Sequence, residues 1–381
     1  MTSISLSKSN FYFLDFEETK ILFRIFEEHK INARFVGGCV RDALINIRST
    51  DFDIAINIGI IDLMDIFDIH SIHYIKTGIK YGSITVIIND KNFEITSLRI
   101  DLNCLGRDCD TQTTNNFQED ARRRDFTINA IYVDYDGNIY DYFDGIKDLE
   151  NQSVNFIGDP KTRIQEDNLR ILRYYRFITK FNDISNKYSP ILQESSHLIK
   201  TLSIERIQKE ILKIIEYQNS HTTLKMMIDD NILPQIFDKI FIENFEKLNI
   251  FQNNTIPLKL YILFDIDELL KKFHLTREYK KILKLYRSLE SEDYRYIYIK
   301  YGISIVHDIM KIRYIKYDEP CDFERTFKKI GKFCISFDDL PKSIENPGKK
   351  LKITEKWWIN NDGTKSKEEC LSFILNDKNF E

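Results

Sequence analysis

Apolar side chains in the first part of the chain recur at helical intervals and then at strand intervals. In residues 17–30, Ile21, Leu22, Ile25 and Phe26 are spaced like one face of a helix. The elements predicted after this helix are a short strand at 34–36, a Gly-Gly turn, a helix at 40–47, and a strand that starts at 51 and alternates apolar with polar side chains.

Two predicted strand pairs follow. Residues 83–88 and 93–98 read as a hairpin that turns at 89–91. Residues 128–134 and 139–142 are joined through Asp-Gly and extend the same sheet. The first 150 residues therefore predict a small domain of mixed α/β type.

Beyond Pro160 the strand signals nearly vanish and helical spacing takes over. Helices are predicted at 164–179 and 204–217, and amphipathic segments continue to about residue 316. The fold class predicted from this change is α+β. The predicted divisions are a catalytic head at 1–150, a helical neck at 151–217, a helical body at 218–316 and a tail at 317–381.

Composition excludes several classes of protein. The formal net charge of −4 argues against a protein that coats nucleic acid indiscriminately, although a local basic face remains possible. The six cysteines include no Cys-x-x-Cys pair, so neither a zinc site nor a disulfide framework is expected. No segment approaches 18 uninterrupted apolar residues, and the first residues lack the pattern of a signal peptide. We therefore expect a cytoplasmic protein that does not span a membrane.

The strand that starts at 51 carries the candidate catalytic residues, Asp51 and Asp53. Side chains at positions i and i+2 of a strand point to the same face, which is the arrangement that holds a pair of Mg²⁺ ions. Gly37 and Gly38 leave backbone amides uncovered for a phosphate, and Arg41 follows within the first turn of the next helix. Together these residues predict a phosphate site beside a metal site.

The segment 35–44 (FVGGCVRDAL), followed by 51–53 (DFD), resembles the signature of the class II tRNA nucleotidyltransferase and bacterial poly(A) polymerase family. Four more segments match that family in order, namely 123–130 (RRDFTINA), 141–149 (DYFDGIKDL), 166–173 (EDNLRILR) and 203–210 (SIERIQKE). The resemblance covers roughly residues 33–216. It implies a head resembling the polymerase-β nucleotidyltransferase fold, followed by a helical neck, body and tail.

The resemblance implies roles for the later segments. The segment at 123–130 resembles the ribose- and phosphate-contacting part of the family, with Arg124 as the expected contact and Asn129 assisting. The segment at 141–149 resembles a hinge, and the one at 203–210 a supporting neck helix. Glu94 is the candidate for a third metal-binding carboxylate. Where the family has a flexible loop, between Arg99 and Asp120, this chain keeps Gly106-Arg107 and carries a polar run at 110–116 that departs from the family pattern.

Base choice is expected from the segment at 166–173. Asp167, Arg170 and Arg173 are i+3 neighbours on the predicted helix, so one acceptor and two donors share a strip. A carboxylate accepts from the exocyclic amine of C or A, whereas U and G present a carbonyl there and leave a buried acceptor unpaired, at a cost of about 1–3 kcal/mol. Arg176, one further step along, is a candidate phosphate or primer contact.

The segment 271–316 is predicted to bind the RNA partner. It holds twelve Lys or Arg and five acids. Such a segment suits a phosphate backbone, and its tyrosines are expected to pack on ribose or bases. These are Tyr286, Tyr294, Tyr296 and Tyr298. By resemblance, the body and tail would hold the tRNA elbow while the head holds the tRNA 3′ end.

The predicted function is template-independent addition of the 3′-terminal CCA to tRNA from CTP and ATP, with Mg²⁺ on Asp51 and Asp53. One alternative is a poly(A) polymerase, or a partial enzyme that adds only CC or only A. A second alternative is a non-catalytic RNA-binding protein that keeps the fold as a scaffold; such a protein would be expected to lose one of the two aspartates, and both are present.

Overall fold

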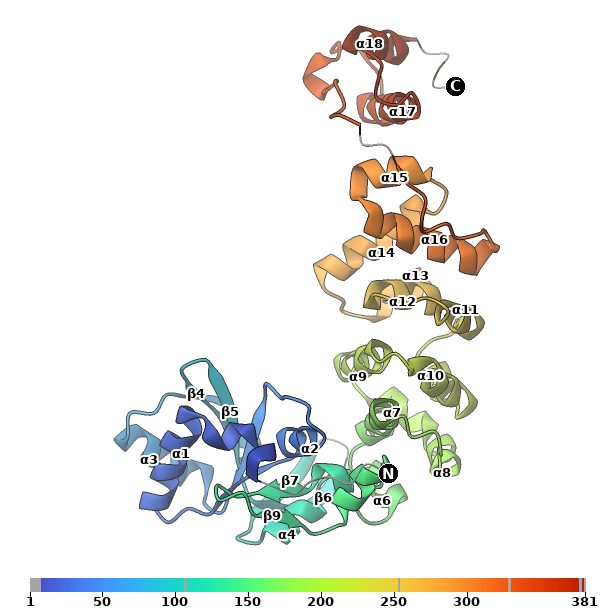
Figure 1. Ribbon diagram of the computed structural model, residues 1–381. Helices are drawn as coiled ribbons and strands as arrows, with labels where there is room; N and C mark the ends of the chain where they lie inside the picture. Colours follow the sequence, from blue (N-terminus) through green and yellow to red (C-terminus); the bar gives the residue numbers. More distant parts are fainter. Residues whose placement is uncertain (1–7, 106–107, 253, 328–329, 377–378, 380–381) are drawn as a thin grey trace. The chain divides into compact units, whose positions relative to one another are not determined.

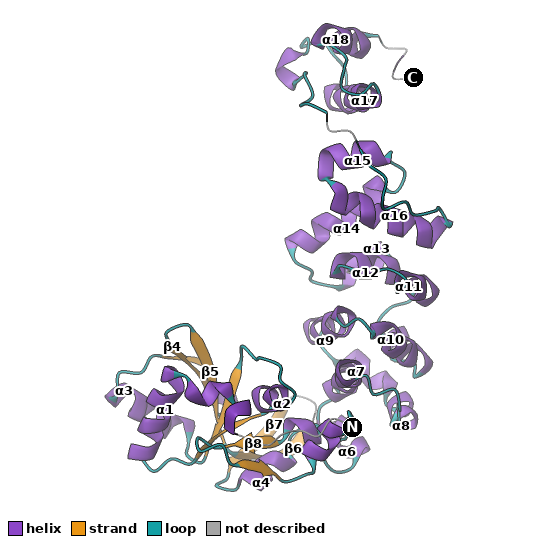
Figure 2. Cartoon of the chain, in the orientation of Figure 1, coloured by secondary structure: helices purple, strands orange, loops and turns teal. Residues whose placement is uncertain are grey.

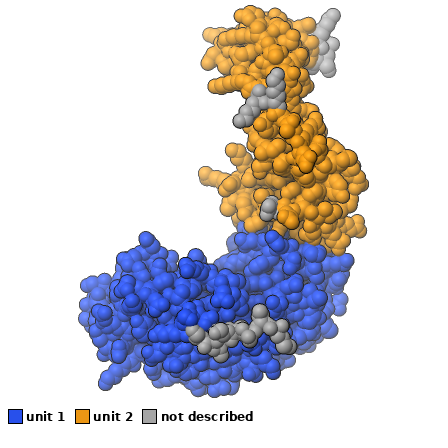
Figure 3. Space-filling view, in the orientation of Figure 1, with its two compact units in different colours: residues 1–238 blue, residues 239–381 orange. Residues whose placement is uncertain are grey.

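The computed structural model describes residues 8–105, 108–252, 254–327, 330–376 and 379. The chain forms two compact units, Met1–Asp238 and Lys239–Glu381, which Figure 3 shows in blue and orange. The strands lie in the first unit, and the described part of the second unit is built from helices and loops (Figure 2). This is the predicted α+β class, with a mixed-sheet head followed by helices.

The head is built on a seven-stranded sheet with the order β3-β4-β5-β2-β1-β8-β9. Neighbouring strands run antiparallel except β2 and β5, which are parallel. The strands are β1 (Ala33–Val36), β2 (Phe52–Ile56), β3 (Tyr74–Gly78), β4 (Ser83–Ile88), β5 (Lys91–Ser97), β8 (Ile131–Val133) and β9 (Ile139–Asp141). The predicted strands at 34–36, 83–88, 93–98 and 139–142 are confirmed, but residues 127–129 form a 3₁₀ helix rather than the start of a strand.

Aromatic side chains hold together the strands that carry the candidate site. The ring of Phe35 on β1 lies 4.6 Å from that of Phe13 and 5.5 Å from that of Phe23. Phe52 on β2 lies 5.7 Å from Phe93 on β5. All five rings are buried, and burying such rings is the main stabilising contribution to a core of this kind.

The helices of the head connect and cover these strands (Figure 1). They are α1 (Glu17–Glu28), α2 (Gly38–Leu44), α3 (Ile60–Ile69), α4 (Phe117–Arg122) and α5 (Gly145–Glu150). Helix α1 forms as its apolar spacing predicts, and buries Leu22, Phe23 and Phe26 while its polar side faces solvent.

The segment at which the family has a loop forms a two-stranded hairpin in this chain. Strands β6 (Arg99–Leu105) and β7 (Asp108–Thr113) pair antiparallel, with Arg99 opposite Thr113. The polar run at 110–116 therefore supplies most of β7. The pair Gly106-Arg107, which the sequence singled out, lies outside the described residues.

The helices of the first unit that follow the head correct one prediction. They are α6 (Pro160–Glu166), α7 (Leu169–Phe181), α8 (Ser189–Glu194), α9 (Ile204–Glu216) and α10 (Ser220–Asp229). The predicted single helix at 164–179 is wrong, because Asp167 ends α6 with an extended backbone (φ −148°, ψ 105°). Helix α7 starts afresh at Leu169 and packs on α9.

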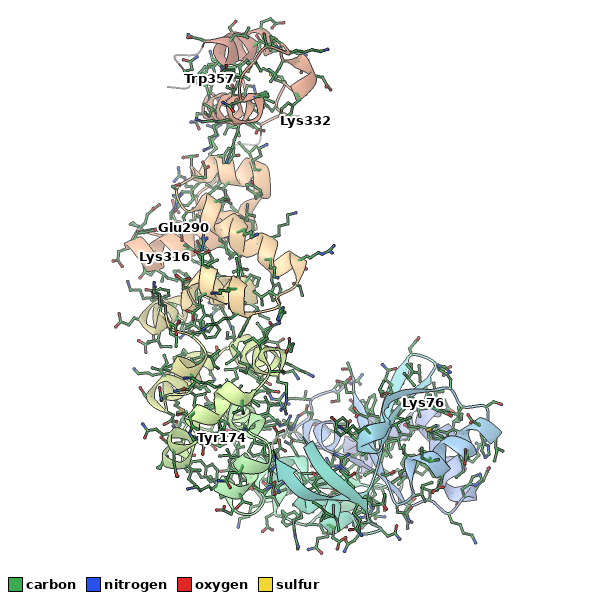
Figure 4. The ribbon with its side chains drawn as sticks, turned by 180° about the vertical axis from the view of Figure 1, so that it is seen from behind. Lys76, Tyr174, Glu290, Lys316, Lys332 and Trp357 are labelled. Carbon is green, nitrogen blue, oxygen red and sulfur yellow. The ribbon has the colours of Figure 1, made fainter. Side chains whose placement is uncertain are left out.

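The described part of the second unit consists of helices and loops. It includes the predicted tail, for which the sequence pattern predicted no individual helices. The helices are α11 (Ile242–Leu248), α12 (Ile256–Leu263), α13 (Ile266–Lys272), α14 (Arg277–Leu289), α15 (Tyr294–Tyr301), α16 (Ile303–Tyr317), α17 (Pro347–Asn360) and α18 (Lys367–Leu375). In the tail, Trp357 of α17, which is labelled in Figure 4, stacks on Phe373 of α18, and their ring centroids are 4.3 Å apart. Among the described residues, no helix combines the length and the apolar character needed to cross a membrane.

Candidate active site

Sheet register brings the candidate carboxylates together. Asp53 on β2 lies opposite Val36 on the antiparallel β1 and opposite Glu94 on the parallel β5. Asp51 precedes β2, two residues before Asp53, and both aspartates line one cavity of about 460 Å³. Asp51 and Glu94 are exposed, whereas Asp53 is half-buried. The start of β2 thus lies near three carboxylates and the Gly-Gly turn.

The surroundings of Asp53 oppose its negative charge. Burial and the neighbouring Glu94 raise its pKa to about 6, and Asp51 adds to the rise, while Arg124 and Arg41 oppose it. Carboxylates that destabilise each other's charge form a site that a cation would stabilise. The donor set consists of carboxylate oxygens, which suits a hard ion such as Mg²⁺.

Gly37 lies against the carboxylate of Asp53. Its φ of +77° is strained for other residues, and a Cβ placed there would stand 3.4 Å from Asp53 Oδ2 and 3.6 Å from Arg124 Nη1. A side chain would therefore sit between the carboxylate and the guanidinium. Gly38 opens α2 and, with Gly37, lines the same cavity. The two glycines keep the space beside Asp53 open.

Arg41 is buried and held by its neighbours. Its Nε donates to Asp42 Oδ1 at 2.8 Å, and its Nη1 donates to Asn129 Oδ1 at 2.5 Å. Lys180 of α7 donates to the same Asp42 oxygen at 2.6 Å, and burial with the nearby Arg41 lowers the pKa of Lys180 to about 8. Asp42 thus joins α2 of the head to α7.

Arg124 is fixed by a buried acid and a phenol. Its Nη2 donates to Asp120 Oδ2 and its Nε to the Tyr132 hydroxyl, each at 3.1 Å, and that hydroxyl donates to Asp120 at 2.7 Å. Burial alone would raise the pKa of Asp120, but Arg124 and Arg123 hold it well below its usual range. Arg124 therefore keeps a fixed position in the wall of the cavity.

Helix α7 lines the opposite part of the cavity with cations. Arg173 pairs with the buried Asp125 at 2.5 Å, and this ion pair keeps the pKa of Asp125 low despite its burial. Arg176 pairs with the buried Glu210 of α9 at 3.2 Å. The structure thus brings together around one cavity most of the residues singled out in the sequence, namely Gly37, Gly38, Arg41, Asp51, Asp53, Arg124, Asn129, Arg173 and Arg176.

The three residues predicted to form a base-reading strip do not lie on one helix. Asp167 does not share a helix with Arg170 and Arg173, because α6 ends at Glu166 and α7 begins at Leu169. Its carboxylate instead receives two hydrogen bonds from Arg206 of α9, both at 2.9 Å. Arg170 donates to Glu166 at 2.6 Å and to the carbonyl of Arg123 at 2.9 Å. Neither Asp167 nor Arg170 is among the residues that line the cavity.

A second cavity, of about 540 Å³, lies against the same residues from the side of β3 to β5. Asp53 and Arg124 line both cavities. The second cavity is completed by Glu94, by Arg99 and Arg123, and by hydroxyl-bearing residues, namely Thr77, Tyr81, Ser83, Thr85 and Thr96. Glu94 thus faces the second cavity, while Asp51 faces the first.

Sequence reasoning missed several polar residues of this region. Lys180 continues the series of cations on α7 by an i+4 step from Arg176, so helical spacing contained the signal. Lys213 also lines the cavity, but it comes from α9, and only packing of α7 on α9 brings it there. Asp120 lies four residues before Arg124, a spacing at which helical neighbours meet, so the sequence contained that signal too. Arg206 reaches Asp167 over 39 residues, and sequence spacing does not reveal that contact.

Three of the four tyrosines of the basic segment are not available as predicted. Tyr286, Tyr294 and Tyr296 are buried, because they form the apolar sides of α14 and α15, and Tyr298 stacks on Phe327. Several cations of the segment form internal pairs, such as Lys316 with Glu290 at 2.5 Å (Figure 4). The cations that remain exposed on one side of α14 are Arg277, Lys281 and Lys284.

Comparisons with known proteins agree with this architecture. The model of the poly A polymerase head domain matches residues 33–155, and that of a probable RNA and SrmB-binding site of polymerase A matches residues 185–241. The chain is 30% identical to the CCA-adding enzyme of Staphylococcus haemolyticus over 80% of its own length and 78% of that protein. It is 35% identical to the human mitochondrial CCA tRNA nucleotidyltransferase 1 over 61% of its own length.

The matched region spans about half the length of the vertebrate mitochondrial relatives, 55% for the human protein. The fold resembles that of a CCA-adding enzyme in an apo form, with a TM-score of 0.68 at 19% identity over 98% of this chain and 99% of that one. It also resembles a Bacillus stearothermophilus CCA-adding enzyme in complex with CTP, with a TM-score of 0.61 at 20% identity over 80% and 79% of the two chains. The chain belongs to the family of CCA-adding enzymes and poly(A) polymerases.

Proposed function

We propose that this protein is a template-independent nucleotidyltransferase that adds the 3′-terminal CCA to tRNA from CTP and ATP. The observation that carries the proposal is the register of β2 and β5, which sets Asp53 beside Glu94. Asp51, Arg124 and Gly37 line the same cavity as Asp53. Carboxylates beside fixed cations suit a reaction that moves a phosphoryl group between two oxygen atoms. The names of the relatives point to the same activity.

Asp51, Asp53 and Glu94 are the residues that would hold Mg²⁺. Bound there, the ion would supply positive charge that favours ionisation of the RNA 3′-hydroxyl and neutralises the triphosphate. The protein's own cations take part in binding. Arg124 and Arg41 are held in place by Asp120 and Asp42, so they meet a triphosphate without reorganising.

In this proposal the 3′-hydroxyl oxygen attacks the α-phosphorus of the bound CTP or ATP, and the bond from that phosphorus to the β-phosphate oxygen breaks. Pyrophosphate leaves with the bonding electron pair, and the hydroxyl proton passes to solvent. Asp167 and Arg170 would choose the base. Because both are paired with other residues here, Asp167 with Arg206 and Arg170 with Glu166, base reading requires that these side chains exchange partners or share them.

The test is incorporation of nucleotides into a tRNA transcript that ends before CCA. We expect CTP alone to give two additions, CTP with ATP to give three, and neither UTP nor GTP to be used. Repeated addition of A would identify a poly(A) polymerase, and arrest after CC or addition of A alone would identify a partial enzyme.

A variant with Asp53→Asn distinguishes catalysis from binding. It should retain tRNA binding and lose incorporation. A wild-type chain that binds tRNA and never extends it would instead identify a non-catalytic RNA-binding protein. That the enzyme works in the cytoplasm stays a prediction.

A further inference from the structure

We propose that the head carries a second, separate metal site for a divalent transition ion such as Zn²⁺, formed by Glu28, His29 and His70. These residues lie at the ends of two helices, α1 and α3. None of them lines either cavity around Asp53. The proposal does not depend on the nucleotidyltransferase reaction.

The three side chains direct their ligand atoms to one point. His29 Nε2 lies 3.0 Å from His70 Nε2, and His70 Nε2 lies 3.8 Å from Glu28 Oε2. All three ligand atoms lie within 4.8 Å of one another. The two imidazole planes meet at 85°, so the rings approach from different directions and do not stack.

These separations fit a shared ion. Zn–N and Zn–O bonds of about 2.0–2.2 Å at a tetrahedral angle place neighbouring ligand atoms roughly 3.3–3.5 Å apart. The observed 3.0 Å and 3.8 Å bracket that range, so small side-chain rotations bring the atoms into place. Two imidazoles with one carboxylate select a transition ion over Mg²⁺ or Ca²⁺, which prefer sets of oxygen atoms.

The local backbone also favours a cation. His29 is the C-terminal cap of α1 and His70 that of α3, so the negative ends of two helix dipoles meet at the site. Neither helix has a basic residue in its last turn. Glu28 adds a carboxylate at the C-terminal end of α1, where the helix dipole already disfavours negative charge. Lys30 follows in a left-handed turn and is exposed. A bound cation would offset this concentration of negative potential.

Such an ion would link two parts of the head that are 41 residues apart along the chain. Helices α1 and α3 already touch inside the head through Phe26 and Phe67, whose ring centroids are 6.3 Å apart. The ion would join the same helices at their exposed ends. Because it binds the folded head and has no assembled site in the unfolded chain, it would raise thermal stability. Three protein ligands leave the remaining position to water.

The test is titration of the full chain with ZnCl₂ by calorimetry, in an Asp51→Asn/Asp53→Asn background that removes the carboxylate site. Binding of one ion per chain is expected. His29→Gln or His70→Gln should weaken it by about tenfold or more, since each removes one of three ligands. His73→Gln is the matched control, because His73 is exposed nearby and outside the cluster.

A second measurement uses Co²⁺, whose visible absorption reports its coordination. An imidazole-dependent absorption that appears in the parent chain and disappears in His29→Gln supports the proposal. Zn²⁺ binding that is unchanged in both His29→Gln and His70→Gln, or the absence of one-to-one binding to the parent chain, would overturn it. All three histidine variants should show the circular dichroism spectrum of the parent, because His29 and His73 are exposed and His70 is half-buried at the end of α3.

Discussion

Arg206 donates from one nitrogen to both carboxylate oxygens of Asp167, at 2.9 Å each. This contact joins α9 to the point where α6 ends and α7 begins. The same carboxylate accepts from the backbone N–H of Leu169 at 3.1 Å, so the start of α7 and Arg206 together fix its orientation. Arg206 is therefore the side chain that positions the predicted base-reading acid.

Substitution of Arg206 should reduce base discrimination. In Arg206→Gln, we expect the ratio of kcat/KM for CTP over UTP to fall by about tenfold, which corresponds to roughly 1.4 kcal/mol of lost preference. Single-turnover incorporation with each triphosphate measures this ratio. Lys209→Gln, an exposed substitution on the same helix, should leave the ratio as it is. An unchanged ratio in Arg206→Gln would show that Arg206 does not position Asp167 for base choice.

Asp53 should destabilise the metal-free protein at neutral pH. Its pKa of about 6 in the folded chain exceeds the ordinary 3.8, so the folded state binds the proton more tightly than the unfolded state does. The free energy of unfolding therefore falls as pH rises from about 4 to 6 and stays lower above that. Asp53→Asn removes this dependence and should stabilise the chain at pH 7 by on the order of 1–3 kcal/mol.

The measurement for Asp53 is the melting temperature in EDTA at pH 4.5 and pH 7. The gain from Asp53→Asn should be present at pH 7 and small at pH 4.5, where the native carboxyl is already protonated. Glu27→Gln serves as the control, because that side chain is exposed and lines neither cavity around Asp53. A gain of equal size at both pH values would contradict the explanation.

Asp120 should be essential for the stability of the head. Its side chain is 1% exposed and neutralises Arg123 and Arg124. Removing one partner of a buried ion pair costs about 3–5 kcal/mol, so Asp120→Ala should lower the free energy of unfolding by that amount. Glu27→Ala, on the exposed side of α1, should have little effect.

Two optical signals separate the units in that experiment. Both tryptophans, Trp357 and Trp358, lie in α17, so their fluorescence follows the second unit. Far-ultraviolet circular dichroism includes the head. Asp120→Ala should shift the dichroism transition and leave the fluorescence transition in place. A destabilisation seen only by fluorescence would contradict a role of Asp120 in the stability of the head.

The exposed cations of α14 should govern the salt dependence of tRNA binding. In the triple variant Arg277→Gln/Lys281→Gln/Lys284→Gln, the slope of log affinity against log salt should decrease by about 2–3, since each phosphate contact contributes about 0.7–0.9. Filter binding at several salt concentrations measures the slope. Arg287→Gln is the control, because Arg287 is also on α14 but pairs with Asp267 at 2.8 Å. A slope that stays constant in the triple variant would place the RNA elsewhere.

Periodicity and short motifs were sufficient to predict the fold of the head and a set of residues that the structure groups around one cavity. Asp51, Asp53 and the Gly-Gly turn are close in sequence, and all of them line one cavity. Pairing between strands that are distant in the chain could not be predicted from the sequence. The parallel register that sets Glu94 beside Asp53 joins strands 41 residues apart, so Glu94 was only a candidate among outward-facing acids.

Helix interruptions and internal pairing explain the remaining differences. Residues 164–179 have helical spacing throughout, and the break at Asp167 leaves that spacing almost unchanged. The tyrosines of the basic segment were predicted to contact RNA because the sequence does not show which side of α14 or α15 packs against other helices. Their burial depends on packing within the second unit, as for Tyr286, whose hydroxyl donates to Asp308 of α16 at 2.6 Å.

Asp53 and Arg124 line both cavities, so binding in one cavity is thermodynamically coupled to binding in the other. A ligand that enters one cavity changes the electrostatic field and the proton occupancy of residues that also face the other cavity. The affinities of the two cavities are therefore linked, and the linkage is reciprocal, so each ligand alters the affinity for its counterpart by the same factor. If one cavity binds the triphosphate and the other the RNA terminus, the stability of the ternary complex does not depend on which ligand binds first. Asp53 and Arg124 would then set the cooperativity between the two ligands.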